Sequence, residues 1–102
     1  MNFKTFFLTL FIFLNANALE GFEALPYEIA CGLITESALV LKAATRYGDK
    51  AAIMESINKA FEFSYQCEDG LIKHPESIII QRGVKHLKMI EGFYEQNKKA
   101  LR

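Results

Sequence analysis

The sequence lacks the short motifs that carry most catalytic chemistries. It has no Gly-x-Ser-x-Gly, no His-Glu-x-x-His, no glycine-rich phosphate loop, no Cys-x-x-Cys pair and no tryptophan. The four motifs serve acyl transfer, zinc hydrolysis, nucleotide binding and dithiol redox chemistry. A catalytic site also needs a concave pocket with an oriented acid, base or nucleophile, which three short helices rarely enclose. We therefore expect a protein without enzymatic activity, catalytic residues or a cofactor.

Metal ligands are equally scarce, because the chain has only two cysteines and two histidines. In number they make a tetrahedral set, but the order and spacing of Cys31, Cys67, His74 and His86 match no close-paired zinc module. We expect no metal site. We expect His74 to belong to the turn before Pro75, and His86 to lie at the edge of an apolar helix face.

The first 18 residues have the grammar of a secretory signal peptide. Lys4 supplies a positive charge, residues 6–14 are a nine-residue apolar core that includes one threonine, and Ala16 and Ala18 are the small residues that signal peptidase reads. The run is too short for a membrane anchor, which needs roughly 20 apolar residues. We predict cleavage before Leu19 and export, most simply to a bacterial periplasm and otherwise to the medium.

About 84 residues then remain, and domains of that size bury only about 60–65% of their unfolded surface. They often need a covalent staple. Cys31 and Cys67 lie in an exported chain, where an oxidising compartment favours a disulfide between them. They also lie 18 residues either side of Asp49. Two antiparallel helical arms that meet at Asp49 would bring the two sulfurs level, so we predict this pairing.

Hydrophobic periodicity predicts an all-α domain over residues 19–102, with helices at about 26–47, 50–67 and 75–96. No repeat, low-complexity tract or linker divides it. Pro26 suits the first position of a helix, Gly48 the position after a helix end, and Asp49 an N-cap. We expect Asp69-Gly70 to end the second helix and residues 97–102 to fray.

The expected core positions recur at three- to four-residue spacing. Gly83 falls among them, where its lack of a side chain would permit close helix approach, although each glycine inside a helix costs roughly 1 kcal/mol against alanine. The full set is Leu33, Ile34, Ala38, Val40, Leu41, Ala44, Tyr47, Ile53, Met54, Ile57, Ala60, Phe61, Ser64, Tyr65, Ile79, Ile80, Gly83, Val84, Leu87, Ile90, Phe93 and Tyr94.

Charge is distributed unevenly along the predicted mature chain. Residues 19–69 hold nine acidic and four basic side chains, and residues 70–102 hold three acidic and seven basic ones. The whole is close to neutral, which argues against nucleic acid as a partner. Arg82, Lys85 and Lys88 form a basic stripe on the predicted third helix. One interpretation is intramolecular, since cations complement a helix C-terminus and the two halves attract each other. The other is a docking face for an acidic partner or, less favoured, an anionic membrane surface.

These expectations combine into a functional hypothesis: an exported, non-enzymatic helical protein that binds another protein in the periplasm or envelope, as an inhibitor, immunity factor or regulator. Arg82, Lys85 and Lys88 are the candidate partner-binding residues. Two alternatives stay open. In outline (signal peptide, about 85 mature residues, helices and one disulfide) the chain is similar to periplasmic acid-stress chaperones. A phage-type lysis regulator acting at the membrane is the other.

Overall fold

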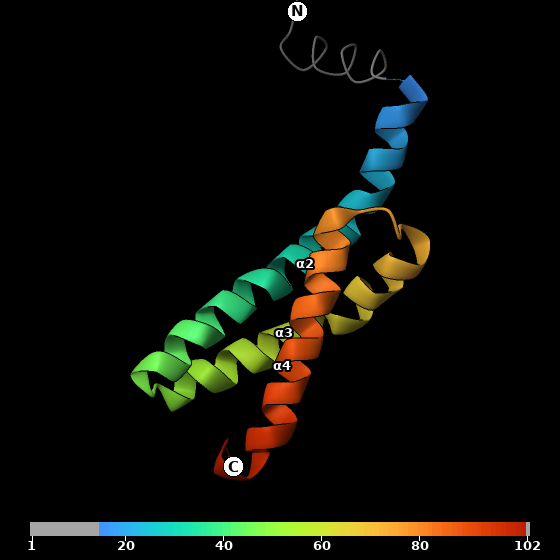
Figure 1. Ribbon diagram of the computed structural model, residues 1–102. Coiled ribbons are helices and arrows are strands. Elements are labelled where there is room, and N and C mark those ends of the chain that lie inside the picture. The colour runs from blue at the N-terminus through green and yellow to red at the C-terminus, as the bar shows by residue number, and fades with distance from the viewer. Residues whose placement is uncertain (1–14, 102) are drawn as a thin grey trace, which may run out of the picture.

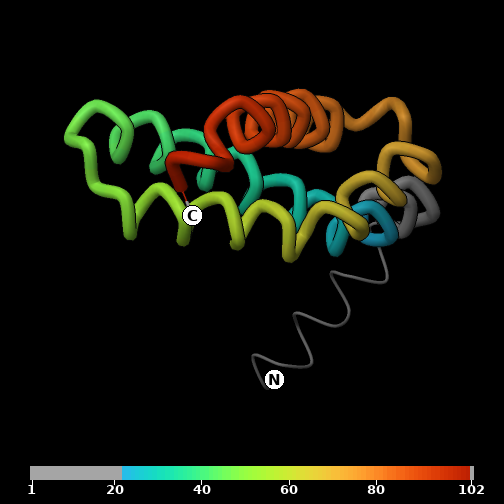
Figure 2. Tube along the Cα trace, turned by 90° about the horizontal axis from the view of Figure 1, so that it is seen from below, coloured from blue at the N-terminus to red at the C-terminus, as the bar shows by residue number. Residues whose placement is uncertain are grey.

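Three helices make up the described part of the protein: α2 (Asn15–Tyr47), α3 (Lys50–Lys73) and α4 (Ile78–Leu101). The computed structural model describes residues 15–101, with side chains from residue 22 onward. α2 and α3 form an antiparallel hairpin, and α4 lies across one face of it (Figures 1 and 2). The predicted all-α class and helix hairpin are confirmed. The predicted leader, residues 1–18, falls largely outside the described residues, so its cleavage stays a prediction.

The hairpin turn forms as its residue types predict. Gly48 has a φ of 67°, in the left-handed region that a residue without Cβ adopts at little cost. Asp49 is the N-cap of α3, and its carboxylate accepts the backbone N–H of Ala52 at 3.1 Å. The turn therefore reverses the chain midway between the two cysteines.

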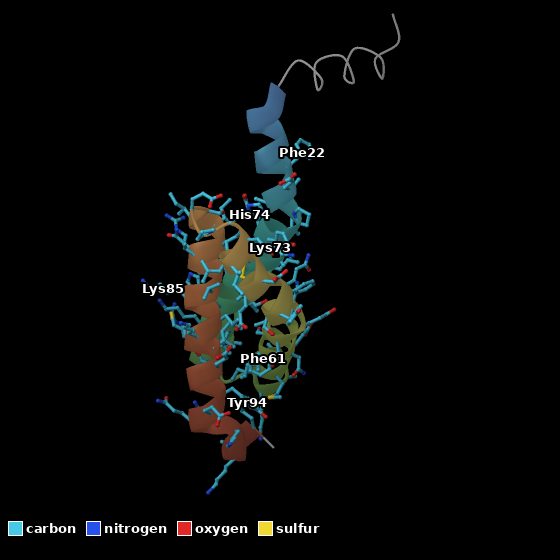
Figure 3. All side chains as sticks on the ribbon, turned by 90° about the vertical axis from the view of Figure 1, so that its right-hand side faces the viewer. Phe22, Phe61, Lys73, His74, Lys85 and Tyr94 are labelled. Carbon is cyan, nitrogen blue, oxygen red and sulfur yellow. A yellow bond between two sulfur atoms is a disulfide. The ribbon has the colours of Figure 1, made fainter. Side chains whose placement is uncertain are left out.

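The helices extend beyond their predicted limits at three places. α2 begins at Asn15, and Pro26 lies inside it rather than at its start. A proline in a helix removes one backbone hydrogen bond, but the residues around it are mostly good helix formers. The Gln66 side-chain amide also donates to the Pro26 carbonyl at 3.5 Å. Phe22 consequently lies on a part of α2 that reaches past the other two helices (Figure 3).

α3 continues through Asp69-Gly70, where the sequence predicted a break, and ends at Lys73. Gly70 is buried against Tyr27 of α2, and a Cβ there would lie 2.6 Å from the Tyr27 Cβ. The small residue is thus used for helix contact and not for a turn. The His74 backbone N–H donates to the Gly70 carbonyl at 2.7 Å and closes the helix.

α4 starts at Ile78, three residues later than the predicted Pro75, and runs to Leu101. The Ser77 hydroxyl accepts the Ile80 backbone N–H at 3.4 Å and caps the start. The predicted fraying from residue 97 is wrong for residues 97–101. There the Asn97 amide donates to the Phe93 carbonyl at 2.8 Å, and Leu101 packs against the core.

The core is built around the two cysteines, which are fully buried and lie at disulfide-bonding distance with their Cα atoms 4.9 Å apart. Gly83 of α4 lies directly on Cys31, so the predicted close approach is confirmed. Phe61 of α3 and Tyr94 of α4 meet edge to face at 5.5 Å between ring centroids (Figure 3). The buried apolar cluster comprises Cys31, Ile34, Leu41, Ala44, Ile53, Ile57, Ala60, Cys67, Ile80, Val84, Leu87 and Ile90.

Four of the expected core residues are instead exposed: Val40, Tyr47, Tyr65 and Ile79. A single helix covers only one face of the hairpin (Figure 2), so positions at the margins of the apolar arcs face solvent. Tyr47 lies at the hairpin turn, and Tyr65 is 82% exposed on α3.

Candidate functional site

The predicted basic stripe lies on the outward side of α4. Arg82, Lys85 and Lys88 are all exposed, whereas Gly83 and Leu87 on the other side of the same turns are buried. Figure 3 shows Lys85 projecting from the side of α4 away from the hairpin. Among the side chains of residues 22–101 no carboxylate forms a salt bridge with any of the three. Their charge therefore faces solvent without a direct intramolecular partner.

Two apolar side chains extend the stripe. Ile78 and Met89 are 63% and 60% exposed. Ile78 lies one turn before Arg82, and Met89 lies one turn after Lys85, so the four residues form one outward line. Sequence reasoning did not select Ile78 or Met89. Their exposure could have been predicted from helical periodicity, because the 3.6-residue period places them opposite the buried residues of α4.

A groove of about 400 Å³ runs beside this line, between α2 and α4. It begins where the helices move apart. Gly83 holds α4 close to Cys31, and from there the two helices separate toward Tyr47 and Leu101 (Figures 1 and 2). The walls are mostly apolar, and the lining residues are Ala38, Leu39, Leu41, Lys42, Thr45, His86, Met89, Ile90 and Phe93.

His86 is the polar residue of α4 in this groove. It is partly buried, at the edge of the apolar face as expected. Its Nδ1 atom is buried and has no hydrogen-bond partner among the described residues. Lys42 is the charged residue of the lining, so this groove presents positive charge beside an apolar surface.

Two other hollows differ from the groove in their charge. One, of about 180 Å³ between α2 and α3, is lined by Glu36, Glu55 and Lys59 among others. The second, on the outer side of α3, is lined by Glu55, Lys59 and Glu62 among others. Both contain carboxylates, and the described lining of the α2–α4 groove contains none.

A polar cluster ties the end of α3 to α2. Lys73 Nζ donates to the Tyr27 hydroxyl at 3.0 Å and pairs with Asp69 at 3.1 Å. These contacts, the hydrogen bond to Tyr27 first and Asp69 second, raise the pKa of Lys73 above its ordinary value. The His74 ring lies 5.6 Å from the Tyr27 ring, consistent with a place in the turn before Pro75 (Figure 3). A lysine held protonated is a poor nucleophile or base, so this cluster connects helices and does not suggest catalysis.

The fold separates the two cysteines and two histidines that were considered as metal ligands. Cys31 and Cys67 bond to each other, His74 faces Tyr27, and His86 lines the groove. Among the described side chains, residues 22–101, no three histidines, cysteines, aspartates or glutamates gather in a way that could hold a metal ion.

One stretch of α2, Phe22–Tyr47, is long and apolar enough to cross a membrane, with a mean hydropathy of 1.4. A buried helix of a water-soluble bundle passes the same test, and this stretch lies near the N-terminus. It also forms one wall of the core, where Cys31 is bonded to α3.

Comparison of the chain with protein-family models, with curated proteins and with solved structures finds no match.

Proposed function

We propose that this protein is an exported, non-enzymatic helical protein that acts by binding another protein through the outward face of α4. Its setting is the periplasm or envelope, and its class of action is inhibition, immunity or regulation. The observation that carries the proposal is the line of Ile78, Arg82, Lys85 and Met89, in which two exposed cations lie between two exposed large apolar side chains.

This combination is typical of protein interfaces. Arginine and methionine are enriched there, and apolar anchors beside charges supply both affinity and orientation. Large apolar side chains on the outward face of a helix do nothing for the core of this domain, because the buried face of α4 is already filled by Ile80, Leu87 and Ile90. Their exposure is accounted for if a partner covers them.

The intramolecular explanation of the stripe fits less well. Cations stabilise a helix when they lie in its last turn, where the dipole is negative. Lys98 and Lys99 occupy that position in α4, but Arg82 lies near its beginning, where a cation opposes the dipole. Lys98 is also paired with Glu95 at 3.0 Å, unlike the residues of the stripe.

Export is supported by the signal-peptide grammar of residues 1–18 and by the buried pair Cys31–Cys67, since disulfides persist in oxidising compartments. The membrane-acting alternative draws on the hydropathy of Phe22–Tyr47. Insertion of that stretch would require α2 to leave the core and to carry α3 with it through the disulfide, which favours the folded bundle as the active form.

Site-specific photo-crosslinking in the cells of origin tests the proposal. A photoreactive residue replaces Lys85 in one variant and Tyr65, exposed on α3, in the matched control. We expect the exported fraction to hold a protein adduct that forms from position 85 and not from position 65. Equal labelling from both positions, or no adduct from position 85, would contradict a docking face on α4.

A further inference from the structure

We infer that the α2–α4 groove is the recognition pocket for this partner, and that it takes an apolar anchor side chain from a partner segment whose flanking residues are carboxylates. The inference rests on the proposed function and names the chemistry of the partner. The α2–α4 groove has a volume of about 400 Å³, and Leu39, Lys42, His86 and Met89 are among the residues that line it.

The groove is a consequence of the fold and is shaped before any partner binds. Gly83 lets α4 touch the backbone of Cys31, and the disulfide fixes Cys31 to α3. Beyond this point the axes of α2 and α4 separate (Figure 1). The space between them is floored by the buried residues Leu41 and Ile90. A preformed apolar hollow suits a side chain that enters it without rearranging the helices.

Apolar side chains also stand at the rim. Leu39 of α2 is 63% exposed and Met89 of α4 is 60% exposed, one on each side of the groove. No described residue covers them. Met89 belongs as well to the outward line with Lys85, so the groove is continuous with the proposed docking face. A partner lying on that face would reach the groove at Met89.

Cations lie in the groove and next to it along both of its helices. Lys42 lines it, Arg46 follows one turn later on the same side of α2, and on α4 Arg82 and Lys85 lie one turn before His86 and Met89. The other two hollows contain Glu55 and a second glutamate. Complementarity of charge therefore selects a partner segment with carboxylates around its apolar anchor.

Two other occupants fit less well. A bilayer surface is broad, and it would meet Leu39 and Met89 at the rim without filling the hollow between them. A second copy that placed groove on groove would set Lys42 and Lys85 against their own counterparts, and like charges in contact disfavour association.

Methyl NMR titration with short synthetic peptides tests the inference. The probe peptide carries Leu and Phe among Asp and Glu residues. One control peptide replaces the acids by Lys, and another replaces Leu and Phe by Ala. We expect the probe to shift the methyl signals of Leu39, Met89 and Ile90 to saturation, and each control to bind at least about tenfold more weakly. No shift up to about 1 mM probe, or equal binding of the lysine peptide, would overturn the inference.

A variant pair checks the location. Leu39→Glu/Met89→Glu places negative charge, the same sign as the probe peptide, at the rim of the groove. Tyr65→Glu/Ile72→Glu makes the same change at exposed positions of α3. We expect the first pair to abolish the peptide-induced shift of the Ile90 methyl signal, which both pairs keep, and the second pair to retain it, with helical circular dichroism unchanged in both. Loss in both pairs would overturn the groove as the site.

The same titration separates this inference from the proposed function. If the methyl signals of the groove respond to anionic lipid vesicles but not to the peptide, the occupant is a lipid surface and the inference is overturned. If these signals move with protein concentration alone, the occupant is a second copy of the protein and the inference is overturned. A position-85 adduct whose yield is unchanged by Leu39→Glu, a change in the groove wall of α2 alone, would leave the proposed function standing and remove the groove from it.

Discussion

Gly83 of α4 lies directly against Cys31 of α2, at the point where Cys31 is bonded to Cys67 of α3. A Cβ at position 83 would lie 2.8 Å from both the Cα and the carbonyl oxygen of Cys31. All three helices meet there, and the neighbouring atoms are the Cβ and the backbone of a disulfide-bonded cysteine, which have little freedom to yield. The contact therefore sets how α4 crosses the hairpin and where the α2–α4 groove opens.

Gly83→Ala should lower the free energy of unfolding by up to about 2 kcal/mol, because overpacking costs about 1–3 kcal/mol and alanine gains only about 1 kcal/mol over glycine in a helix. Gly92→Ala is the matched control, since nothing lies within 4 Å of a Cβ built there. It should stabilise by about 0.5–1 kcal/mol. Urea unfolding measures both, and equal effects at the two glycines would contradict the close approach.

Removal of both cysteines should be costly. Cys31→Ala/Cys67→Ala opens a loop of 36 residues' separation, and the chain-entropy relation gives a loss of roughly 3–4 kcal/mol. Because both sulfurs are fully buried, wild-type protein should also resist reduction until it unfolds. Urea unfolding of the double variant and of the wild type measures the loss of stability. Urea unfolding of the wild type with and without reductant measures its resistance to reduction. A loss below about 1 kcal/mol would contradict the central place of the bond.

The N-cap of α3 gives a smaller and separate effect. Asp49→Ala should cost about 1 kcal/mol, because the Ala52 N–H loses the carboxylate that it donates to. Asp49→Asn keeps an acceptor oxygen and should stay within a few tenths of a kcal/mol of the wild type. Thermal unfolding of the two variants decides, and an equal loss in both would show that the negative charge, and not the cap, stabilises the turn.

The contacts of Lys73 predict that the stability of the protein depends on pH in the alkaline range. Its hydrogen bonds to Tyr27 and Asp69 raise its pKa above the ordinary value of 10.5. The stability that this group contributes is fully present below the unfolded pKa and is lost as pH rises through the folded pKa. Wild type should exceed Lys73→Met in melting temperature at about pH 8, and the difference should shrink above about pH 10.5.

Because Lys73 is exposed, its contribution should be modest. Lys50→Met, which removes one lysine from the same helix, is the matched control. A difference for Lys73→Met that stayed constant into the alkaline range would contradict the assigned contacts.

Much of this fold follows from local signals. Gly48 and Asp49 predict the hairpin turn through positive φ and capping, and their position midway between Cys31 and Cys67 predicts the pairing of the sulfurs. The outward position of the basic stripe follows from helical periodicity. The close approach of a neighbouring helix at Gly83 was also predictable. Gly83 lies on the apolar face of α4, and it has no side chain that would hold the neighbouring helix away.

The helix limits were less predictable, because contacts far along the chain override local preferences. Pro26 and Gly70 are both turn or terminus signals, and both lie inside helices. Gln66 reaches the Pro26 carbonyl, and Gly70 packs on Tyr27. The groove was not predictable either. Its walls are Leu39 and Met89, 50 residues apart in the sequence, and it exists only because of the angle at which α4 crosses α2.

The docking face on α4 is tested most directly by charge reversal in the crosslinking experiment. Arg82→Glu/Lys88→Glu is compared with Lys50→Glu/Lys59→Glu, an equal change of charge on α3, with the photoreactive residue at position 85 throughout. We predict that the first pair removes the adduct and that the second leaves its yield and its salt dependence unchanged. Equal adduct yields from the two pairs would show that α4 does not bind the partner through its cations, and would contradict the account.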